Sequence, residues 1–322
     1  MSTTSAVSSP RSLWNKAWAI SPILTVSTVV MLIGAAFTTA GLLLDTRQLV
    51  GEPVWMKPTK FYVSLVIYNA TILYFLSFLS EHRRFVRGVG TILSAVGIVE
   101  MVGITVQAAR GVRSHFNAAT PFDQAIFSMM GIAILVLWLT MVVLAVALLR
   151  AKLADRPLAS ALRIGLLIGV VGAGLGGFMT TPRAEQISAI KAGEQKVERG
   201  AHTFGGKDGG PGLPVVGWST TAGDMRPAHF LGLHGMQVLP GLAALLARRR
   251  SRSEIQRLAL IRTTGVAYFG LMAVLAVQAL RALPITQWDM TGVASLAVVV
   301  LASLVTFAVS ILRKPAPELV AA

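Results

Sequence analysis

Long apolar stretches separated by short polar segments dominate the sequence. Eight of them hold roughly 18 or more residues, enough to cross a hydrocarbon core of ~30 Å at about 1.5 Å per residue. They cover approximately residues Ile20–Leu44, Phe61–Leu79, Val89–Gln107, Ala125–Leu149, Leu162–Thr180, Ala228–Ala247, Leu258–Leu280 and Met290–Leu312. The pattern predicts an all-α integral membrane protein, a bundle of about eight transmembrane helices. Because the first stretch is too long for the apolar core of a signal peptide, we interpret it as a membrane anchor.

The order of apolar and polar segments predicts one polytopic helical membrane domain, residues 20–312, between an N-terminal tail (1–19) and a C-terminal tail (313–322). The longest connection, residues 181–228, joins the fifth and sixth predicted helices, and loops of that length are usually functional or disordered. Its segment Ala184–Arg199 is rich in helix-forming residues, which predicts a short surface helix. The glycine-rich and proline-rich stretch that follows excludes regular helix.

Charge decides the predicted orientation of the helices. Only 13% of the residues are charged, about half of the roughly 25% usual in a soluble domain, yet the net charge is +15. Of the 29 lysines and arginines, 17 fall in the two tails and in the connections on their side, where the net charge is about +13 against +3 on the other side. Lysine and arginine concentrate on the cytoplasmic side of membrane proteins. We therefore expect both termini in the cytoplasm, the 181–228 loop outside, and a place in the plasma (inner) membrane.

The distribution of lysine and arginine also predicts which partners the protein binds. Topology and contact with anionic headgroups account for the basic excess, so we expect the lipid bilayer and no nucleic acid as a partner. The absence of cysteine excludes disulfides, cysteine-ligated metals and thiol nucleophiles.

Polar residues inside apolar segments are costly and therefore indicate function. Glu100 lies seven residues before Gln107, and His234 lies seven residues after Pro227, so both are expected ~10 Å below the outer surface. We predict that they form facing walls of an externally open polar pocket. The residues predicted to bind a ligand or protons are Glu100, His234, Gln237, His229, Asn69, Gln107, Arg110, Asp224, Arg226 and Gln278.

A carboxylate at that depth needs a proton, a cation or a metal to neutralise it. Candidate metal ligands are His229, His234, His115 and Glu100, because imidazole and carboxylate suit zinc, iron or copper. The five-residue spacing of the two histidines near Pro227 places them about 140° apart on a regular helix. They would share a metal only if His229 lay outside the helix, so the metal and cofactor content stays open.

Two further patterns concern architecture. Gly165, Gly169, Gly172 and Gly176 form one stripe on a predicted helix, which favours close approach of another helix. The two halves of the chain show no matching broken spans or matching loops, so an inverted-repeat transporter architecture has no support.

Three functions fit this sequence. The first is binding or transport of a small polar or anionic solute, with proton coupling through Glu100 and His234 as one form. The second is a membrane-embedded metal-dependent or haem-dependent enzyme, and the third is a structural or assembly subunit of a membrane complex. The partners expected besides lipid are that small molecule and further protein chains, in a homo-oligomer or a hetero-oligomer.

Overall fold

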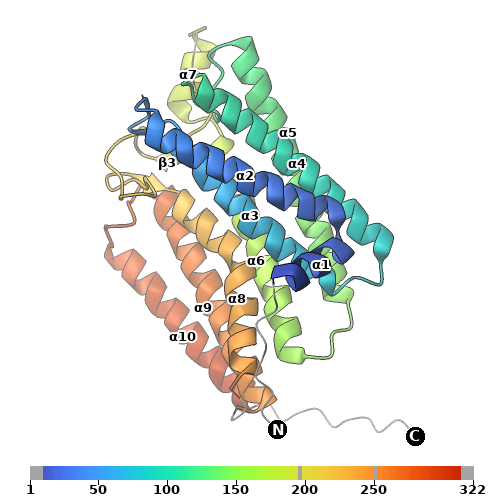
Figure 1. The fold of residues 1–322 in the computed structure, drawn as a ribbon. Helices are drawn as coiled ribbons and strands as arrows, with labels where there is room; N and C mark the ends of the chain where they lie inside the picture. Colours follow the sequence, from blue (N-terminus) through green and yellow to red (C-terminus); the bar gives the residue numbers. More distant parts are fainter. Residues whose placement is uncertain (1–9, 195–197, 250–251, 313–322) are drawn as a thin grey trace, which may run out of the picture. The chain divides into compact units, whose positions relative to one another are not determined.

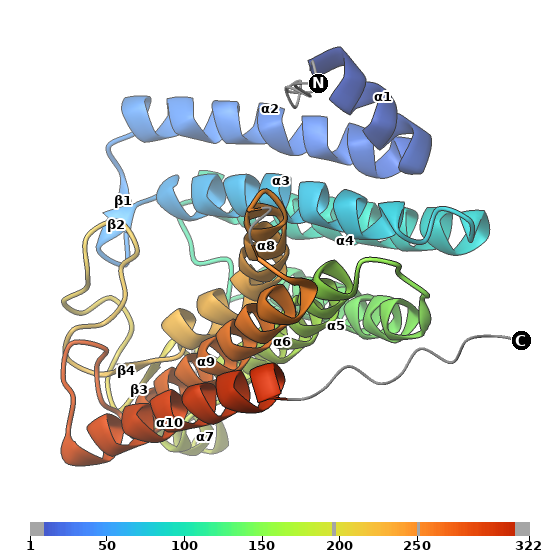
Figure 2. The ribbon, with the colours of Figure 1, turned by 90° about the horizontal axis from the view of Figure 1, so that it is seen from below.

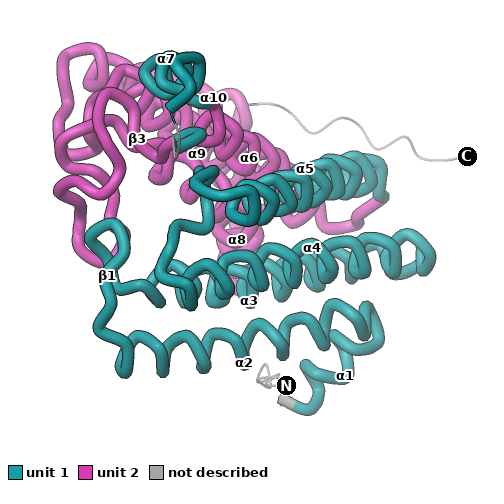
Figure 3. Tube along the Cα trace, turned by 90° about the horizontal axis from the view of Figure 1, so that it is seen from above, with its two compact units in different colours: residues 1–151, 182–200 teal, residues 152–181, 201–322 magenta. Residues whose placement is uncertain are grey.

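The computed structural model describes residues 10–194, 198–249 and 252–312, and in that part the chain forms ten helices and four short strands (Figure 1). The chain divides into two compact units (Figure 3). Residues 1–151 and 182–200 make up the first unit, and residues 152–181 and 201–322 make up the second. The predicted C-terminal tail and the first nine residues lie outside the described residues. Each unit contains four long apolar helices.

The first unit is a helical bundle with one β-ribbon. Its elements are α1 (Pro10–Ile20), α2 (Pro22–Leu44), β1 (Gln48–Leu49), β2 (Glu52–Pro53), α3 (Met56–Ser77), α4 (Arg83–Ala109), α5 (Pro121–Arg150) and α7 (Ala184–Lys191). Helix α2 packs on α3 and α4, α3 packs on α4, and α4 packs on α5. Side chains of Met31, Met101, Ile104 and Met130 form a core between these helices. Ser21 and Thr120 accept hydrogen bonds from backbone N–H groups at the starts of α2 and α5, where a proline occupies the first helical position.

Helix α1 falls in the predicted N-terminal tail. It lies at an angle to α2 (Figure 2) and exposes Leu13, Trp14 and Trp18. The two tryptophan rings stack with their centroids 5.6 Å apart. Exposed Arg11 and Lys16 accompany them. Short amphipathic helices with tryptophan and basic residues are typical of the membrane–water interface.

The second unit contains α6 (Arg156–Thr180), β3 (Thr203–Phe204), β4 (Gly223–Asp224), α8 (Arg226–Ala247), α9 (Glu254–Leu280) and α10 (Met290–Leu312). Helix α6 packs on α8 and α9, α8 packs on α9, and α9 packs on α10. The glycine stripe of α6 faces α8: a Cβ atom on Gly172 would lie 2.5 Å from the Cα atom of Gly232, and one on Gly165 would lie 2.6 Å from the carbonyl oxygen of Gly235. The predicted role of this stripe in close helix packing is confirmed.

Eight of the ten helices are long and apolar enough to span a membrane, which agrees with the predicted membrane bundle. Helices α3 and α4 begin five and six residues earlier than hydropathy predicts. Their first turns carry Lys57 and Lys60 in α3 and Arg83 and Arg84 in α4, which are helical but polar, so an apolar window does not detect them. The cytoplasmic location of the termini stays a prediction.

The predicted surface helix Ala184–Arg199 is shorter in the structure, where α7 ends at Lys191. Gly193 adopts a φ of 80°, and the Glu194 N–H donates to the carbonyl oxygen of Ala189. A glycine in the left-handed region with such a bond ends a helix. Residues 195–197 of the predicted helix lie outside the described residues.

Candidate functional site

Glu100 is the buried carboxyl group of the first unit. It lies near the middle of α4, nine residues before the end of that helix, and is 3% exposed. Neither of its carboxylate oxygens has a hydrogen-bond partner among the described residues. The nearest basic atom is Nε2 of His115, 3.4 Å from Oε1, which is an ion-pair distance rather than a well-formed hydrogen bond.

His115 comes from the loop between α4 and α5. The loop turns back into the unit, so that the imidazole ring lies among the aromatic rings of Phe61, Phe116 and Phe127, with centroids 6.0, 6.1 and 6.4 Å away. Its Nδ1 atom lies 3.1 Å from Oγ of Ser114. Nζ of Lys57 lies 5.6 Å from the centre of the Phe61 ring. The pair thus sits in aromatic surroundings beside a lysine.

This environment disfavours an isolated charge on either side chain. Burial lowers the pKa of His115, and the charge of Lys57 lowers it further, against the opposing effect of Glu100. A buried carboxylate without hydrogen bonds is costly. A proton on Glu100, or one on His115 that gives an imidazolium ring facing the carboxylate, would remove that cost.

A second polar cluster holds both ends of the His115 loop. Asp123, buried in the first turn of α5, accepts hydrogen bonds from Nε2 of Gln107 at 2.8 Å, from Nη1 of Arg110 at 2.5 Å and from Oγ1 of Thr120 at 2.7 Å. Arg110 also contacts Oε1 of Gln107, and its guanidinium group lies 4.8 Å from the centre of the Phe122 ring. We call Gln107, Arg110 and Asp123 the clasp. It ties the end of α4 to the start of α5.

Other contacts fix the middle of the loop. Phe116, next to His115, adopts a φ of 62°, which is costly for a residue with a bulky side chain. Its carbonyl oxygen accepts a hydrogen bond from the Arg199 N–H at 2.9 Å, and Arg113 pairs with Glu198 at 2.6 Å. The segment 198–200 therefore holds the strained backbone that places His115.

In the second unit, His229 and His234 have different surroundings. Nδ1 of His229 lies 2.7 Å from the carbonyl oxygen of Gly172 in α6, so this nitrogen donates. His234, five residues further along α8, lies on an exposed face, with its ring 6.4 Å from that of Phe230. Gln237 is half-buried on the same helix. Since α8 includes both histidines, His229 does not leave the helix in the way that a metal shared with His234 requires.

The remaining predicted site residues of this unit have structural partners. Asp224 accepts hydrogen bonds from Nε and Nη2 of Arg226 and from the Ser219 N–H, so it is a buried charge pair at the start of α8. Gln278 donates from Nε2 to the carbonyl oxygens of Pro284 and Gln287, both at 2.8 Å. These contacts account for the burial of Asp224 without a ligand. In Gln278 they satisfy the amide nitrogen, whereas Oε1 is buried and has no hydrogen-bond partner among the described residues.

The predicted residues thus fall into separate groups. Asn69 lies in the first unit, where Nδ2 is 3.4 Å from Oγ of Ser27. The first unit brings Glu100 together with His115 and brings Gln107 together with Arg110. The pairing of Glu100 with His234 stays a prediction, because the two residues belong to different units. Among the described residues, no group of three histidine or carboxylate side chains comes together to hold a metal ion.

Sequence reasoning missed Asp123 and the partner of Glu100. Asp123 lies in the sequence Thr-Pro-Phe-Asp, a helix-start signal that could have moved the start of the fourth span from Ala125 to Pro121. The return of His115 to Glu100 depends on the positive φ of Phe116. No sequence signal indicates that conformation.

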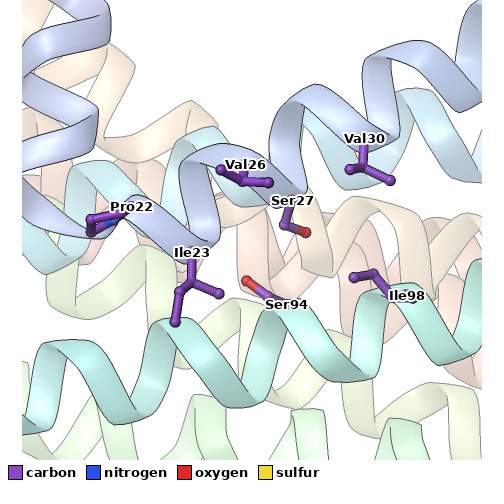
Figure 4. A pocket seen from close by; sticks show the side chains of 7 residues that line it. All are labelled: Pro22, Ile23, Val26, Ser27, Val30, Ser94 and Ile98. Carbon is purple, nitrogen blue, oxygen red and sulfur yellow. The ribbon is translucent and has the colours of Figure 1, made fainter.

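A groove lies elsewhere in the first unit, between α2 and α4 (Figure 4). Its volume is about 260 Å³. Its lining is formed by Pro22, Ile23, Val26, Ser27, Val30, Ser94 and Ile98.

Comparison with known proteins gives no family for this chain. No protein-family model matches the sequence, and no curated protein and no solved structure is significantly similar to it.

Proposed function

We propose that this multi-pass membrane protein binds a small anionic solute at the end of the first unit that carries Glu100 and His115, and that binding is coupled to a proton held by this pair. The observation that carries the proposal is the buried carboxyl group without a hydrogen bond, 3.4 Å from an imidazole nitrogen. Perturbed and buried titratable pairs are typical of functional sites, and ionisable residues inside membranes are typical of proton relays.

The surrounding charges support an anionic solute. Lys57 lies beside the Phe61 ring. Arg110 and Arg113, which also pair with Asp123 and Glu198, lie on the loop that carries His115. Cations near a weakly solvated site raise the local concentration of anions. The aromatic rings around His115 limit access of water to the pair. We further propose that this end of the protein faces the outside of the plasma membrane, as the distribution of lysine and arginine predicts.

The first test measures the proton directly. Infrared difference spectroscopy of the protein in lipid nanodiscs, between about pH 5 and about pH 8, detects the carbonyl band of a protonated buried carboxylic acid. We expect a band in the wild type that is absent in Glu100→Gln. In His115→Gln we expect the band to remain, with a shift in the pH at which it is half-maximal. Gln278→Leu, which alters a buried polar group of the second unit, is the control and keeps the band. A wild type without the band would overturn the proposal.

The second test measures coupling. Proteoliposomes loaded with a pH-sensitive dye receive short-chain monocarboxylates or inorganic phosphate, and the internal pH is followed. We expect acidification with at least one of these anions, lost in Glu100→Gln. The structural-subunit alternative predicts that the wild type and Glu100→Gln behave alike. An enzyme with a bound metal predicts stoichiometric metal in the purified protein.

A further inference from the structure

The two units share one order of helix packing. In each, the first long helix packs on the second and third, the second packs on the third, and the third packs on the fourth: α2, α3, α4 and α5 in the first unit, α6, α8, α9 and α10 in the second. Each also has a two-stranded ribbon between its first and second long helices. Four spans carry a chain back to the side from which it started, so the number of candidate spans predicts that both units begin on the same side of the membrane.

The ends of the third helices match in sequence. Met101–Arg110 reads MVGITVQAAR and Met272–Arg281 reads MAVLAVQALR, with five of ten positions identical. The identical methionine, glutamine and central alanine are buried in both helices.

The backbone matches as well. In α4 the N–H groups of residues 110, 111 and 112 donate to the carbonyl oxygens of residues 106, 108 and 107, and in α9 those of 281, 282 and 283 donate to 277, 279 and 278. The residue after the arginine is in the left-handed region in both, Gly111 at φ 71° and Ala282 at φ 61°. Alanine rarely adopts this conformation. The two helices therefore end in the same way although the residue type differs.

The ion pair that follows is also repeated. Arg110 pairs with Asp123 at 2.5 Å, and Arg281 pairs with Asp289 at 2.5 Å. Each aspartate follows threonine, one variable residue and an aromatic residue, in Thr120–Asp123 (TPFD) and Thr286–Asp289 (TQWD), directly at the start of the fourth helix.

The first and second helices show the same correspondence. The starts of the second helices read Met56–Phe61 (MKPTKF) in α3 and Met225–Phe230 (MRPAHF) in α8, where Met225 is the residue before the first helical one. The first helices share Leu-Ile-Gly, and in each unit this glycine faces the second helix: Gly34 faces Tyr62 of α3, and Gly169 faces Met236 of α8, which lies further along its helix than Tyr62 does. Seven residues later, Gly41 faces Trp55 and Gly176 faces His229.

From these matches we infer that the protein consists of two copies of one four-span module, fused in tandem with the same orientation. A comparison of loops and broken spans does not detect this repeat, because the loops differ most and because the repeat is parallel rather than inverted. The glutamine, arginine and aspartate of the clasp belong to the common framework.

The repeat distinguishes the residues that both modules share from the residues of the proton site, a distinction that rests on the proposed function. The position of Glu100 corresponds to Leu271 in the second module. The loop from Gly111 to Ala119 has nine residues, whereas its counterpart, Ala282 to Ile285, has four. Both members of the Glu100–His115 pair are thus confined to the first module. They are a paired addition to a module that folds without them, and Asp123 is a positioning residue that holds the loop carrying His115.

The test uses the second module as the template for the first. In one variant, Glu100→Leu introduces leucine, the residue at the equivalent position of the second module. In another, the sequence Ala-Leu-Pro-Ile of the second module replaces residues 111–119. We expect both to keep the wild-type melting temperature, or exceed it, while the infrared band of the carboxylic acid is lost in Glu100→Leu and altered in the loop exchange. The framework variants Gln107→Leu and Gln278→Leu lower the melting temperature by similar amounts.

The two measurements separate the two hypotheses. A loop exchange that unfolds the protein, or unequal effects of Gln107→Leu and Gln278→Leu, overturns the duplication whatever the infrared result. An unchanged band in Glu100→Leu overturns the proton site while leaving the duplication intact. Asp123→Asn completes the set: as a positioning residue it shifts the pH midpoint of the band, which a purely structural role would leave in place.

An independent observation concerns the groove between α2 and α4. It runs from Pro22 at the start of α2 to Val30, a length of about 12 Å along the helix, which is close to the ~15 Å depth of one hydrocarbon leaflet. Its lining is apolar except for the hydroxyl groups of Ser27 and Ser94. Figure 4 shows these side chains from the two helices turned toward one space.

Five exposed cations lie at the same end of the first unit as Pro22: Arg11, Lys16, Arg83, Arg84 and Arg87. None of them forms an ion pair with an acidic residue in the part of the chain that the structure describes. We propose that this end binds an anionic phospholipid, with one acyl chain in the groove and the headgroup among these cations. Clustered basic residues at a membrane surface are typical of such binding.

Native mass spectrometry of protein released from nanodiscs of equal phosphatidylglycerol and phosphatidylcholine tests the proposal. We expect the wild type to retain more phosphatidylglycerol than phosphatidylcholine. The variants Val26→Trp and Ile98→Trp, which fill the groove, should retain several-fold less phosphatidylglycerol than the wild type. Ile132→Trp, on an exposed face of α5, is the matched control. Equal retention of the two lipids, or an equal loss in Ile132→Trp, overturns the proposal. A melting temperature confirms that each variant is folded.

Discussion

The contact between α6 and α8 allows a stringent test of the packing. In Gly172→Ala the new Cβ atom would lie 2.5 Å from the Cα atom of Gly232, whereas carbon atoms in contact prefer ~3.5–4.0 Å. The two backbones must therefore separate by about 1–1.5 Å, and neither backbone offers a side chain that can move aside. The separation also stretches the hydrogen bond of 2.7 Å between His229 and the Gly172 carbonyl oxygen.

The expected magnitude follows from three contributions. Overpacking of this kind costs ~1–3 kcal/mol, and a weakened buried hydrogen bond costs ~0.5–1.5 kcal/mol. Replacing glycine by alanine inside a helix returns ~0.5–1 kcal/mol. We expect Gly172→Ala to lower the free energy of unfolding by about 1–3 kcal/mol. Gly177→Ala on the same helix, whose Cβ would meet nothing within 4 Å, should raise it slightly.

The assay is thermal unfolding in mild detergent, followed by circular dichroism and by size-exclusion chromatography of heated samples. The two alanine variants have the same composition and differ only in which glycine of α6 is replaced. A Gly172→Ala protein that melts at or above the temperature of Gly177→Ala would refute the close approach of α6 and α8.

Three other contacts give measurable outcomes. Asp224→Asn removes the charge facing Arg226 and should speed proteolysis of residues 201–225, at a cost of about 2–3 kcal/mol rather than the ~3–5 kcal/mol of a fully buried pair, because Arg226 is 21% exposed. Burial alone would raise the pKa of Asp208, but hydrogen bonds from His202 and Thr203 hold it well below the ordinary 3.8, so its stabilisation is present above about pH 4 and is lost as the pH falls further. Asp208→Asn should remove this acid dependence of loop protection in hydrogen exchange. Burial lowers the pKa of His115 below about 6.5, so the unfolded chain binds more protons just below that pH and stability falls as the pH falls through this window. His115→Phe should flatten the melting temperature between about pH 5 and about pH 7, and an unchanged slope would contradict the burial of the imidazole.

Hydropathy was sufficient to place the spans because lipid-facing and core-facing side chains are both apolar in a membrane protein. Helix α10 begins at its predicted residue, Met290, because the charged Asp289 directly precedes its apolar stretch. The starts of α3 and α4 were predicted late because their polar first turns lie beyond the hydrocarbon region. The glycine stripe of α6 was predictable because only small residues permit backbone contact at such spacing.

The site was predicted less completely. Burial of Glu100 follows from its place in an apolar helix, but its partner depends on the path of a loop. His115 reaches Glu100 through a left-handed Phe116 and through bonds from Arg199 and Glu198, which lie more than eighty residues away in sequence. Contacts between residues so far apart leave no periodic pattern in the local sequence, so the sequence does not predict them. Asp123 precedes the predicted start of the fourth span at Ala125 because its charge ends the apolar stretch, although it lies in the first turn of α5 and pairs there with Arg110.

The length of helix α5 relates the position of the clasp to the thickness of the bilayer. Asp123 and Arg150 lie 27 residues apart on one helix, which is about 40 Å and close to the ~40–45 Å of a bilayer with its headgroups. Charged groups at both ends favour the two headgroup layers, so a thinner membrane would tilt this helix. Because Asp123 also anchors the loop that carries His115, such a tilt would alter the geometry between His115 and Glu100. The lipid composition of the host membrane would then change the distance between these two side chains.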